Sequence, residues 1–266
     1  MRVRGPLGLF KMPYVLVVGA FLLAPTTMVV VLSFTSSRVL FFPPSGFGVH
    51  WYGNFLHDQT WRSGTITSLK VGVFSMLLAT GLGTLTALGL VRGRFIGRSL
   101  VTALVLSPLI APTVIVGLGM YIMYLRVHLV GTLLALVAAH TALGMPFVVV
   151  NVAASLRTVD RNLELAARNL GAGSVRTFVR ITLPLILPGV LAGALFSFVT
   201  SWDEVVIALF LSTPLLQTLP VVMWTGVQYG VDPTVAAASS VVTAVSLLLL
   251  VGFTVLRLRT AKMAIP

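Results

Sequence analysis

The chain has 266 residues, of which 57% are hydrophobic and only 9% are charged, and its formal net charge is +12. This balance excludes an ordinary soluble domain, in which about a quarter of the residues are charged. The basic residues lie between apolar runs, without the stacking aromatic side chains typical of nucleic-acid binding. There is no cysteine, so disulfide frameworks and thiolate metal sites are also excluded. We therefore expect a single membrane domain over residues 1–266.

Apolar runs without charges predict the membrane-spanning helices, because a span needs about 20 apolar residues. The run 205–231 is interrupted by proline, glycine and polar residues, so we divide it between the end of a helix and an outer loop. The first run is longer than the apolar region of a signal peptide and no A-x-A site follows it, so we expect a retained helix. The predicted spans are about 13–34, 68–91, 99–124, 129–155, 185–211 and 236–257. The expected fold class is an all-α membrane protein with six transmembrane helices.

The distribution of Lys and Arg predicts the orientation of these spans. With both termini inside, fourteen basic residues, including Arg2, Arg4 and Lys262, face the cytoplasm and four face the exterior. A seven-span arrangement would move the basic C-terminal residues outside, and we reject it for that reason. We expect both termini and the loop 156–183 in the cytoplasm.

Two prolines lie within the third predicted span. Pro108 and Pro112 share one helical face and are followed by Gly117 and Gly119. Each proline removes a backbone hydrogen bond, which is tolerated in a membrane where a neighbour or a water-lined cavity satisfies the freed carbonyl. The pattern predicts a bent helix beside a transport pathway.

His140 lies within the fourth predicted span. A proton-relay role would need an acidic partner, and the sequence places none beside it. We expect a neutral, hydrogen-bonded histidine that serves packing.

The stretch 163–184 is polar and bears arginines, although it lies between long apolar runs. Residues spaced i, i+3, i+4 and i+7 give it one apolar helical face: Leu163, Ala166, Ala167 and Leu170. Asp160 can cap this helix at its start, and Gly171 can supply the left-handed residue that ends it. Ser174 can cap a second short helix that leads to Leu183-Pro184. An ordinary helical hairpin in a loop is the alternative to a partner-binding element.

The spacing of these residues resembles the E-A-A-x-x-x-G-x9-I-x-L-P loop of binding-protein-dependent ABC importer permeases. The family glutamate would fall at Leu165, whereas the acid here is Glu164, about 100° away around the helix. Whether Glu164 replaces it is left open. The resemblance covers most of the chain, including 42–56 and 201–212. It implies a type I ABC importer permease fold with a cytoplasmic coupling helix, and these ATPase-coupling residues: Glu164, Ala166, Ala167, Gly171, Leu183 and Pro184.

Two adjacent carboxylates, Asp203 and Glu204, follow a long apolar stretch that begins at Leu185. Carboxylates within a membrane normally face a cavity or a partner. Trp202 beside them could offer a ring face to an ammonium group. The S-W-D-E run resembles the spermidine/putrescine branch of the family, which implies a cationic substrate. We predict a substrate pathway of Trp202, Asp203, Glu204, Pro108 and Pro112; a position of one or both acids at the outer interface remains open.

The sequence contains no phosphate-binding G-x-x-x-x-G-K-[ST] loop, metal-ligand cluster or hydrolase motif. We therefore expect a transport subunit without cofactor or metal, not an enzyme. The resemblance implies a multi-pass protein of a bacterial inner membrane that works with ATP-binding cassette subunits, an extracytoplasmic solute-binding protein and a second permease. A heterodimer is implied, with a homodimer left open. The substrate expected is a polyamine; alternatives are another small solute, a metal ion, or an ion-gradient-driven secondary transporter.

Overall fold

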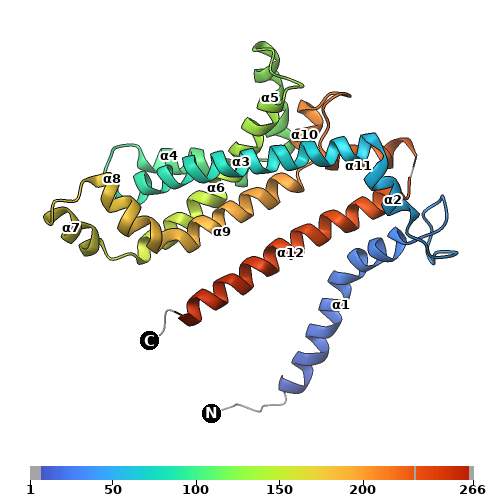
Figure 1. Ribbon diagram of the computed structural model, residues 1–266, viewed down its shortest axis with the longest axis horizontal. Coiled ribbons are helices and arrows are strands. Elements are labelled where there is room, and N and C mark those ends of the chain that lie inside the picture. Colours follow the sequence, from blue (N-terminus) through green and yellow to red (C-terminus); the bar gives the residue numbers. More distant parts are fainter. Residues whose placement is uncertain (1–6, 231, 264–266) are drawn as a thin grey trace. The chain divides into compact units, whose positions relative to one another are not determined.

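A computed structural model describes residues 7–230 and 232–263 of the chain (Figure 1). Arg2 and Arg4, which the orientation argument uses, lie outside the described residues. Over the described part the only strand-like pairings are two isolated bridges, Thr35 with Phe47 and Thr213 with Leu216. The helices are α1 (Leu7–Ser33), α2 (His50–His57), α3 (Gln59–Arg92), α4 (Arg98–Leu106), η1 (Ser107–Leu109), α5 (Thr113–Arg126), α6 (Leu133–Thr158), α7 (Arg161–Asn169), α8 (Ser174–Thr177), η2 (Phe178–Thr182), α9 (Leu183–Trp202), α10 (Val206–Leu211), α11 (Leu219–Tyr229) and α12 (Thr234–Met263).

Among the described residues, five helical segments are long and apolar enough to cross a membrane, and α4 with η1 and α5 makes a sixth if this bent pair counts as one span. The prediction of an all-α membrane protein with six spans is confirmed in this form. The first, second, fourth and sixth predicted spans correspond to α1, α3, α6 and α12. The third and fifth spans depart from the prediction.

The third predicted span, 99–124, is broken in its middle. Its two parts, Arg98–Leu109 and Thr113–Arg126, meet at an angle of 105°. Pro108 lies in the short η1 turn, and Pro112 directly precedes α5. A proline cannot donate to the helical ladder, so this pair ends one helix before the next begins. The predicted bend is confirmed, but a continuous helix over this range is wrong.

The fifth predicted span, 185–211, is also wrong as one continuous helix. The apolar helix starts earlier, and the segment that could cross a membrane is Ser174–Trp202, which includes a π-helical turn at Phe178–Thr182. It ends at Trp202, and α10 begins as a separate short helix at Val206. The break falls at the two carboxylates singled out in the sequence.

The chain divides into two compact units. The first contains residues up to 62 together with 223–244, and the second contains 63–222 and the residues from 245 onward. Within the first unit, the Ser33 and Tyr52 hydroxyls lie 2.6 Å apart and join α1 to α2. Asn54 Nδ2 donates to Thr234 Oγ1 at 2.8 Å and joins α2 to the start of α12.

The second unit is built around α6. Its apolar core joins α3, α6 and α9 in one cluster and α5, α6 and α10 in another. Small residues let the backbones approach closely: a Cβ added at Gly83 of α3 or at Gly193 of α9 would lie 2.7 Å from an atom of Val148 on α6. These two glycines therefore serve the packing of α3 and α9 on α6 within the chain. This bundle carries both candidate site regions.

Candidate functional site

The predicted hairpin at 160–183 is formed by α7 and α8, and local hydrogen bonds fix both ends of α7. Asp160 Oδ1 accepts from the Asn162 backbone N–H at 2.9 Å and caps the start of the helix. Gly171 has φ +86° and ends it. The Ala172 N–H donates to the Ala167 carbonyl at 3.0 Å and the Gly171 N–H to the Arg168 carbonyl at 2.9 Å, which is the Schellman pattern.

The two caps predicted for α7 are thus confirmed, but the cap predicted for α8 is wrong. Gly173 occupies the capping position of α8, and no side chain bonds there. Ser174 is instead the first residue of that helix, which is only four residues long. This helix continues directly through η2 into α9, so its first turn is held by the longer helical segment without a side-chain cap.

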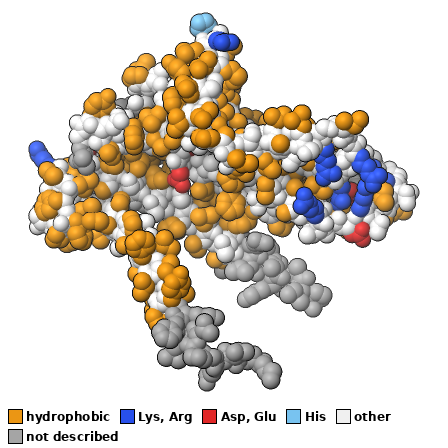
Figure 2. All heavy atoms as spheres, turned by 180° about the vertical axis from the view of Figure 1, so that it is seen from behind, with side chains coloured by type: hydrophobic (Ala, Val, Ile, Leu, Met, Phe, Trp, Pro, Cys, Tyr) orange, Lys and Arg blue, Asp and Glu red, His pale blue; other side chains and the backbone are white. Residues whose placement is uncertain are grey.

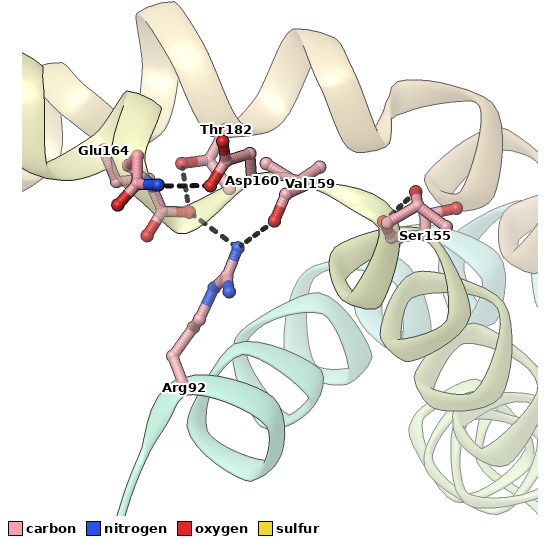
Figure 3. Close-up of polar contacts among 8 residues, drawn as sticks. Arg92, Ser155, Val159, Asp160, Glu164 and Thr182 are labelled. Carbon is pink, nitrogen blue, oxygen red and sulfur yellow. Dashed lines mark hydrogen bonds and ion pairs between the residues drawn. The ribbon is translucent and has the colours of Figure 1, made fainter.

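Glu164 points inward and joins three elements (Figure 3). Its Oε1 lies 3.2 Å from Nη2 of Arg92, the last residue of α3, and accepts from the Thr182 hydroxyl at 3.1 Å. Arg92 Nη2 also donates to the Val159 carbonyl at 3.1 Å. The side chains of Arg92 and Glu164 are 23% and 12% exposed, so water screens this pair only partly. Glu164 therefore ties α7 both to the end of α3 and to the turn that leads into α9.

Leucines occupy the outward positions of the same hairpin. Leu165, at the place of the family glutamate, is 46% exposed, and Leu163 is 47% exposed. Leu170 is 89% exposed, and Val175 of α8 is 77% exposed. Ala166 is exposed and Ala167 is half-buried between these leucines. An apolar surface of this kind, rimmed by arginines, is typical of a surface that contacts another protein.

Leu183 and Pro184 form the exit of the hairpin. Leu183 is half-buried against the cluster that joins α3, α6 and α9, and Pro184 is exposed in the first turn of α9. Pro184 has no N–H to donate, and the five-residue π turn directly precedes this helix. The hairpin thus continues without a gap into the apolar helix.

The second candidate region is the break between α9 and α10, where the two adjacent carboxylates have different environments. Glu204 is 9% exposed, and its Oε1 and Oε2 accept from the backbone N–H groups of Ile207 and Ala208, each at 2.9 Å. Glu204 therefore caps α10 from inside the unit. Asp203 is exposed at the end of α9. The predicted pathway pair is thus divided into a buried acid that caps a helix, Glu204, and an exposed acid, Asp203.

The ring of Trp202 is buried, at 5% exposure. It stacks on Phe198 one turn earlier, with ring centroids 5.9 Å apart and an interplanar angle of 16°. One ring face is therefore already occupied by an aromatic neighbour.

A chain of polar contacts runs through the bundle behind Glu204. His140 Nδ1 of α6 lies 2.7 Å from the Ser201 hydroxyl of α9, and the Ser75 hydroxyl of α3 donates to Ser201 at 3.2 Å. His140 Nε2 has no hydrogen-bond partner and lies 3.9 Å from Glu204 Oε2. The sequence did not reveal that Glu204 is the acidic neighbour of His140, because the two residues are 64 positions apart along the chain. No spacing within one helix could have indicated it.

The helices that begin after the two breaks, α5 and α10, pack on each other. A Cβ added at Gly117 of α5 would lie 2.8 Å from the ring of Phe210 on α10, and that ring lies 6.5 Å from the ring of Tyr121. The segment after Pro112 is therefore held against the segment after Glu204. The sequence predicted the bend at the two prolines, but neither the break after Trp202 nor the contact between α5 and α10. The structure packs α5, which follows Pro112, against α10, which follows Glu204, and it places Glu164 to Pro184 in the hairpin region.

Within the residues that the structure describes, no group of three His, Cys, Asp or Glu side chains could hold a metal ion. The chemistry available in the two regions is that of binding and movement: an exposed apolar hairpin at one, and a carboxylate at a helix break at the other. Together with five or six apolar spans, these features are typical of a membrane transport subunit.

Comparisons with known proteins give the same class. Residues 79–262 match the family of binding-protein-dependent transport system inner membrane components, and the chain belongs to this family. It is 35% identical over 229 residues to the putrescine transport system permease protein PotI of Escherichia coli (strain K12), covering 84% of this chain and 81% of that protein. It is 32% identical over 238 residues to the spermidine/putrescine transport system permease protein PotC of Haemophilus influenzae, covering 90% and 92%.

Solved structures show the same fold. A chain of a bacterial ABC transporter involved in the import of the acidic polysaccharide alginate superposes with a TM-score of 0.72 at 16% identity, over 97% of this chain and 98% of that chain. A chain of the MetNI methionine ABC transporter superposes with a TM-score of 0.57 at 20% identity, over 77% and 95%. The chain is a permease subunit of a binding-protein-dependent ABC importer, a transport component and not an enzyme.

Proposed function

We propose that this permease carries a polyamine, of the putrescine or spermidine class, inward across the cytoplasmic membrane of a bacterium. The observation that carries the substrate class is the exposed carboxylate of Asp203 at the α9–α10 break, in a chain whose relatives PotI and PotC are named for putrescine and spermidine transport. A carboxylate there attracts an ammonium group, and the break gives it a fixed position. Asp203 is the pathway acid in this proposal, and Glu204 supports it by holding α10.

The α7–α8 hairpin is the proposed contact with an ATPase subunit. Its outward leucines, Leu163, Leu165 and Leu170, offer apolar anchors of the kind that fill a groove on a partner. ATP hydrolysis would occur on that separate subunit. The small side chains of Ala166 and Ala167, between the leucines, allow the partner subunit to approach the helix closely. A larger or charged side chain at either position would therefore weaken docking.

Movement of the hairpin would reach the membrane helices through Glu164. This carboxylate binds Arg92 at the end of α3 and Thr182 at the start of the segment that becomes α9. Glu164 thus takes, in our proposal, the place of the family glutamate displaced from position 165, but it acts within the permease rather than at its surface. The continuous helix from Leu183 to Trp202 then leads to the Asp203 break.

The proposed orientation places the hairpin in the cytoplasm, because the exposed arginines gather at that end of the second unit (Figure 2). The excess of Lys and Arg in the segments predicted to be cytoplasmic places both termini there as well. The proposed partners are two ATPase subunits, a second permease that completes the pore as a heterodimer, and an extracytoplasmic solute-binding protein. The alginate transporter, a structural neighbour, is known in complex with a substrate-bound periplasmic protein.

The test is uptake of labelled putrescine and spermidine into proteoliposomes that contain the assembled transporter, ATP and the binding protein. Ala167→Asp should abolish uptake without removing the permease from the membrane, because it places a charge on the docking surface. Thr158→Asp adds the same charge at an exposed position at the end of α6, outside the apolar docking surface, and serves as a control. Wild-type uptake by Ala167→Asp would overturn the docking assignment, and failure of both polyamines to be transported would overturn the substrate class alone.

A further inference from the structure

A groove between α3, α4 and α6 has the shape and the charge of a site for one membrane lipid. We propose that it binds an anionic phospholipid, with the phosphate held by Arg98 and Arg157 and part of an acyl chain along the apolar wall. The site is separate from the hairpin contact and from Asp203. It would stand even if the transported solute were not a polyamine.

The groove is a cavity of about 310 Å³, near the lower end of the range of about 300–1,000 Å³ typical of small-molecule sites. Val149, Ala153 and Arg157 of α6 line it at four-residue intervals, so they share one helical face. Arg98, Thr102 and Leu106 of α4 line it with the same interval. Each face therefore carries an arginine at one end, and the apolar side chains beyond it are Val149 and Ala153 on α6 and Leu106 on α4.

The two arginines lie at the same end of the groove. Arg98 is the first residue of α4 and Arg157 is in the last turn of α6, and α3, which supplies Leu90 and Val91, ends at Arg92. From either arginine, the eight residues to the far end of its face extend about 12 Å along the helix. That depth matches the distance from a headgroup into the upper part of the acyl-chain region.

The charge in the groove is uncompensated. Neither Asp nor Glu lines it, and both arginine side chains are exposed. Arg92 nearby shows the contrast, because its guanidinium is neutralised by Glu164 at 3.2 Å. Two guanidinium groups at the rim of an apolar groove between transmembrane helices are typical of an anionic lipid site. A zwitterionic lipid would bind with lower affinity, because the arginines repel its positively charged amine.

Native mass spectrometry of the purified, delipidated transporter complex, titrated with phosphatidylglycerol or phosphatidylethanolamine, tests the proposal. We expect one phosphatidylglycerol retained per copy of this chain, in preference to phosphatidylethanolamine. Each arginine contributes about fivefold to the affinity, so Arg98→Gln with Arg157→Gln should weaken binding about 25-fold. Arg94→Gln with Arg126→Gln removes the same charge from exposed positions outside the groove and should change binding less than about twofold.

A second variant tests the apolar wall. Ala153→Phe fills the groove and leaves both arginines in place, so it should also lower lipid retention; Ala154→Phe on the same wall replaces it if that variant does not assemble. Unchanged retention in the double arginine variant overturns the proposal. Retention that survives either wall variant but falls with added glycerol phosphate indicates a free-anion site and also overturns it. Loss of the second permease from the complex on filling the groove would show a protein occupant instead.

Discussion

Glu164 and Glu204 each stabilise a junction between helices, but their surroundings differ. Glu164 lies in a hairpin between membrane helices, where it binds an arginine and a threonine from two other elements. Glu204 lies inside the bundle, where it accepts two backbone N–H groups from the start of α10. Each carboxylate holds a joint between helices. The residue next to each carboxylate is exposed: Leu165 follows Glu164, and Asp203 precedes Glu204.

The difference lies in what replaces water around the charge. Glu164 has a cationic partner, so its removal leaves Arg92 with solvent on one side and the Val159 carbonyl on the other. Glu204 has only backbone dipoles and a histidine nitrogen 3.9 Å away, so its removal leaves buried donors unsatisfied. We therefore expect the loss of the Glu204 carboxylate to lower stability more than the loss of the Glu164 carboxylate.

The largest effect is expected from Glu204→Ala. It leaves the N–H groups of Ile207 and Ala208 without acceptors, at about 1–3 kcal/mol for each buried donor, so the second unit should lose about 2–6 kcal/mol of stability. Thermal unfolding of the assembled transporter measures this loss. Glu204→Gln keeps one acceptor oxygen and should lose less than half as much. An unchanged unfolding midpoint for Glu204→Ala would contradict the capping role.

Gly171→Val should have the next largest effect. The glycine has φ +86° with no neighbour near its Cβ position, so a side chain there meets no clash but must adopt a left-handed backbone, at about 2 kcal/mol for a branched residue. The expected result is a permease that is present in the membrane but does not couple ATP hydrolysis to uptake. Gly171→Asn, which tolerates this conformation, should retain coupling. Equal uptake by Gly171→Val and wild type would show that the end of α7 does not matter for coupling.

Asp203→Asn should lower polyamine uptake by about fivefold, since one partly solvated charge contact contributes about 1 kcal/mol. Assembly and thermal stability should stay unchanged, because Asp203 is exposed and caps nothing. Initial uptake rates for putrescine and spermidine give the measurement. Asp203→Glu, which keeps the charge, should restore most of the rate. If Asp203→Asn unfolds the protein, or if Glu restores nothing, the carboxylate is not acting through its charge.

The smallest effect is expected at the partly exposed ion pair between Arg92 and Glu164. Arg92→Met removes the ion pair with Glu164 at the partly solvated end of α3, which should loosen α7 by about 1 kcal/mol or less. Hydrogen exchange of the α7 amides measures this local change. A double-mutant cycle with Glu164→Gln should give a coupling energy near the single loss. Additive losses would show that the two side chains do not act together.

Local patterns in the sequence predicted the elements of this fold, but not their contacts. Asp160 and Gly171 were readable as caps because capping depends on a few neighbouring residues. The break after Trp202 was missed, because the apolar run resumes at Val205 and Val206, and the bonds from Ile207 and Ala208 to Glu204 that cap the new helix cannot be seen in an apolar pattern. The partners Arg92 with Glu164 and His140 with Ser201 lie 72 and 61 residues apart, and no periodicity within one element connects them.

Site-specific photo-cross-linking tests the central claim most directly, since it asks whether the α7–α8 hairpin contacts the ATPase subunit. A photoreactive phenylalanine analogue would replace Leu170, which is 89% exposed on the hairpin, or Leu215, which is 99% exposed in the loop between α10 and α11. Irradiation of the assembled transporter should yield an adduct with the ATPase from position 170 and none from position 215. An ATPase adduct from position 215 but not from position 170 would contradict both the coupling role of the hairpin and the proposed orientation.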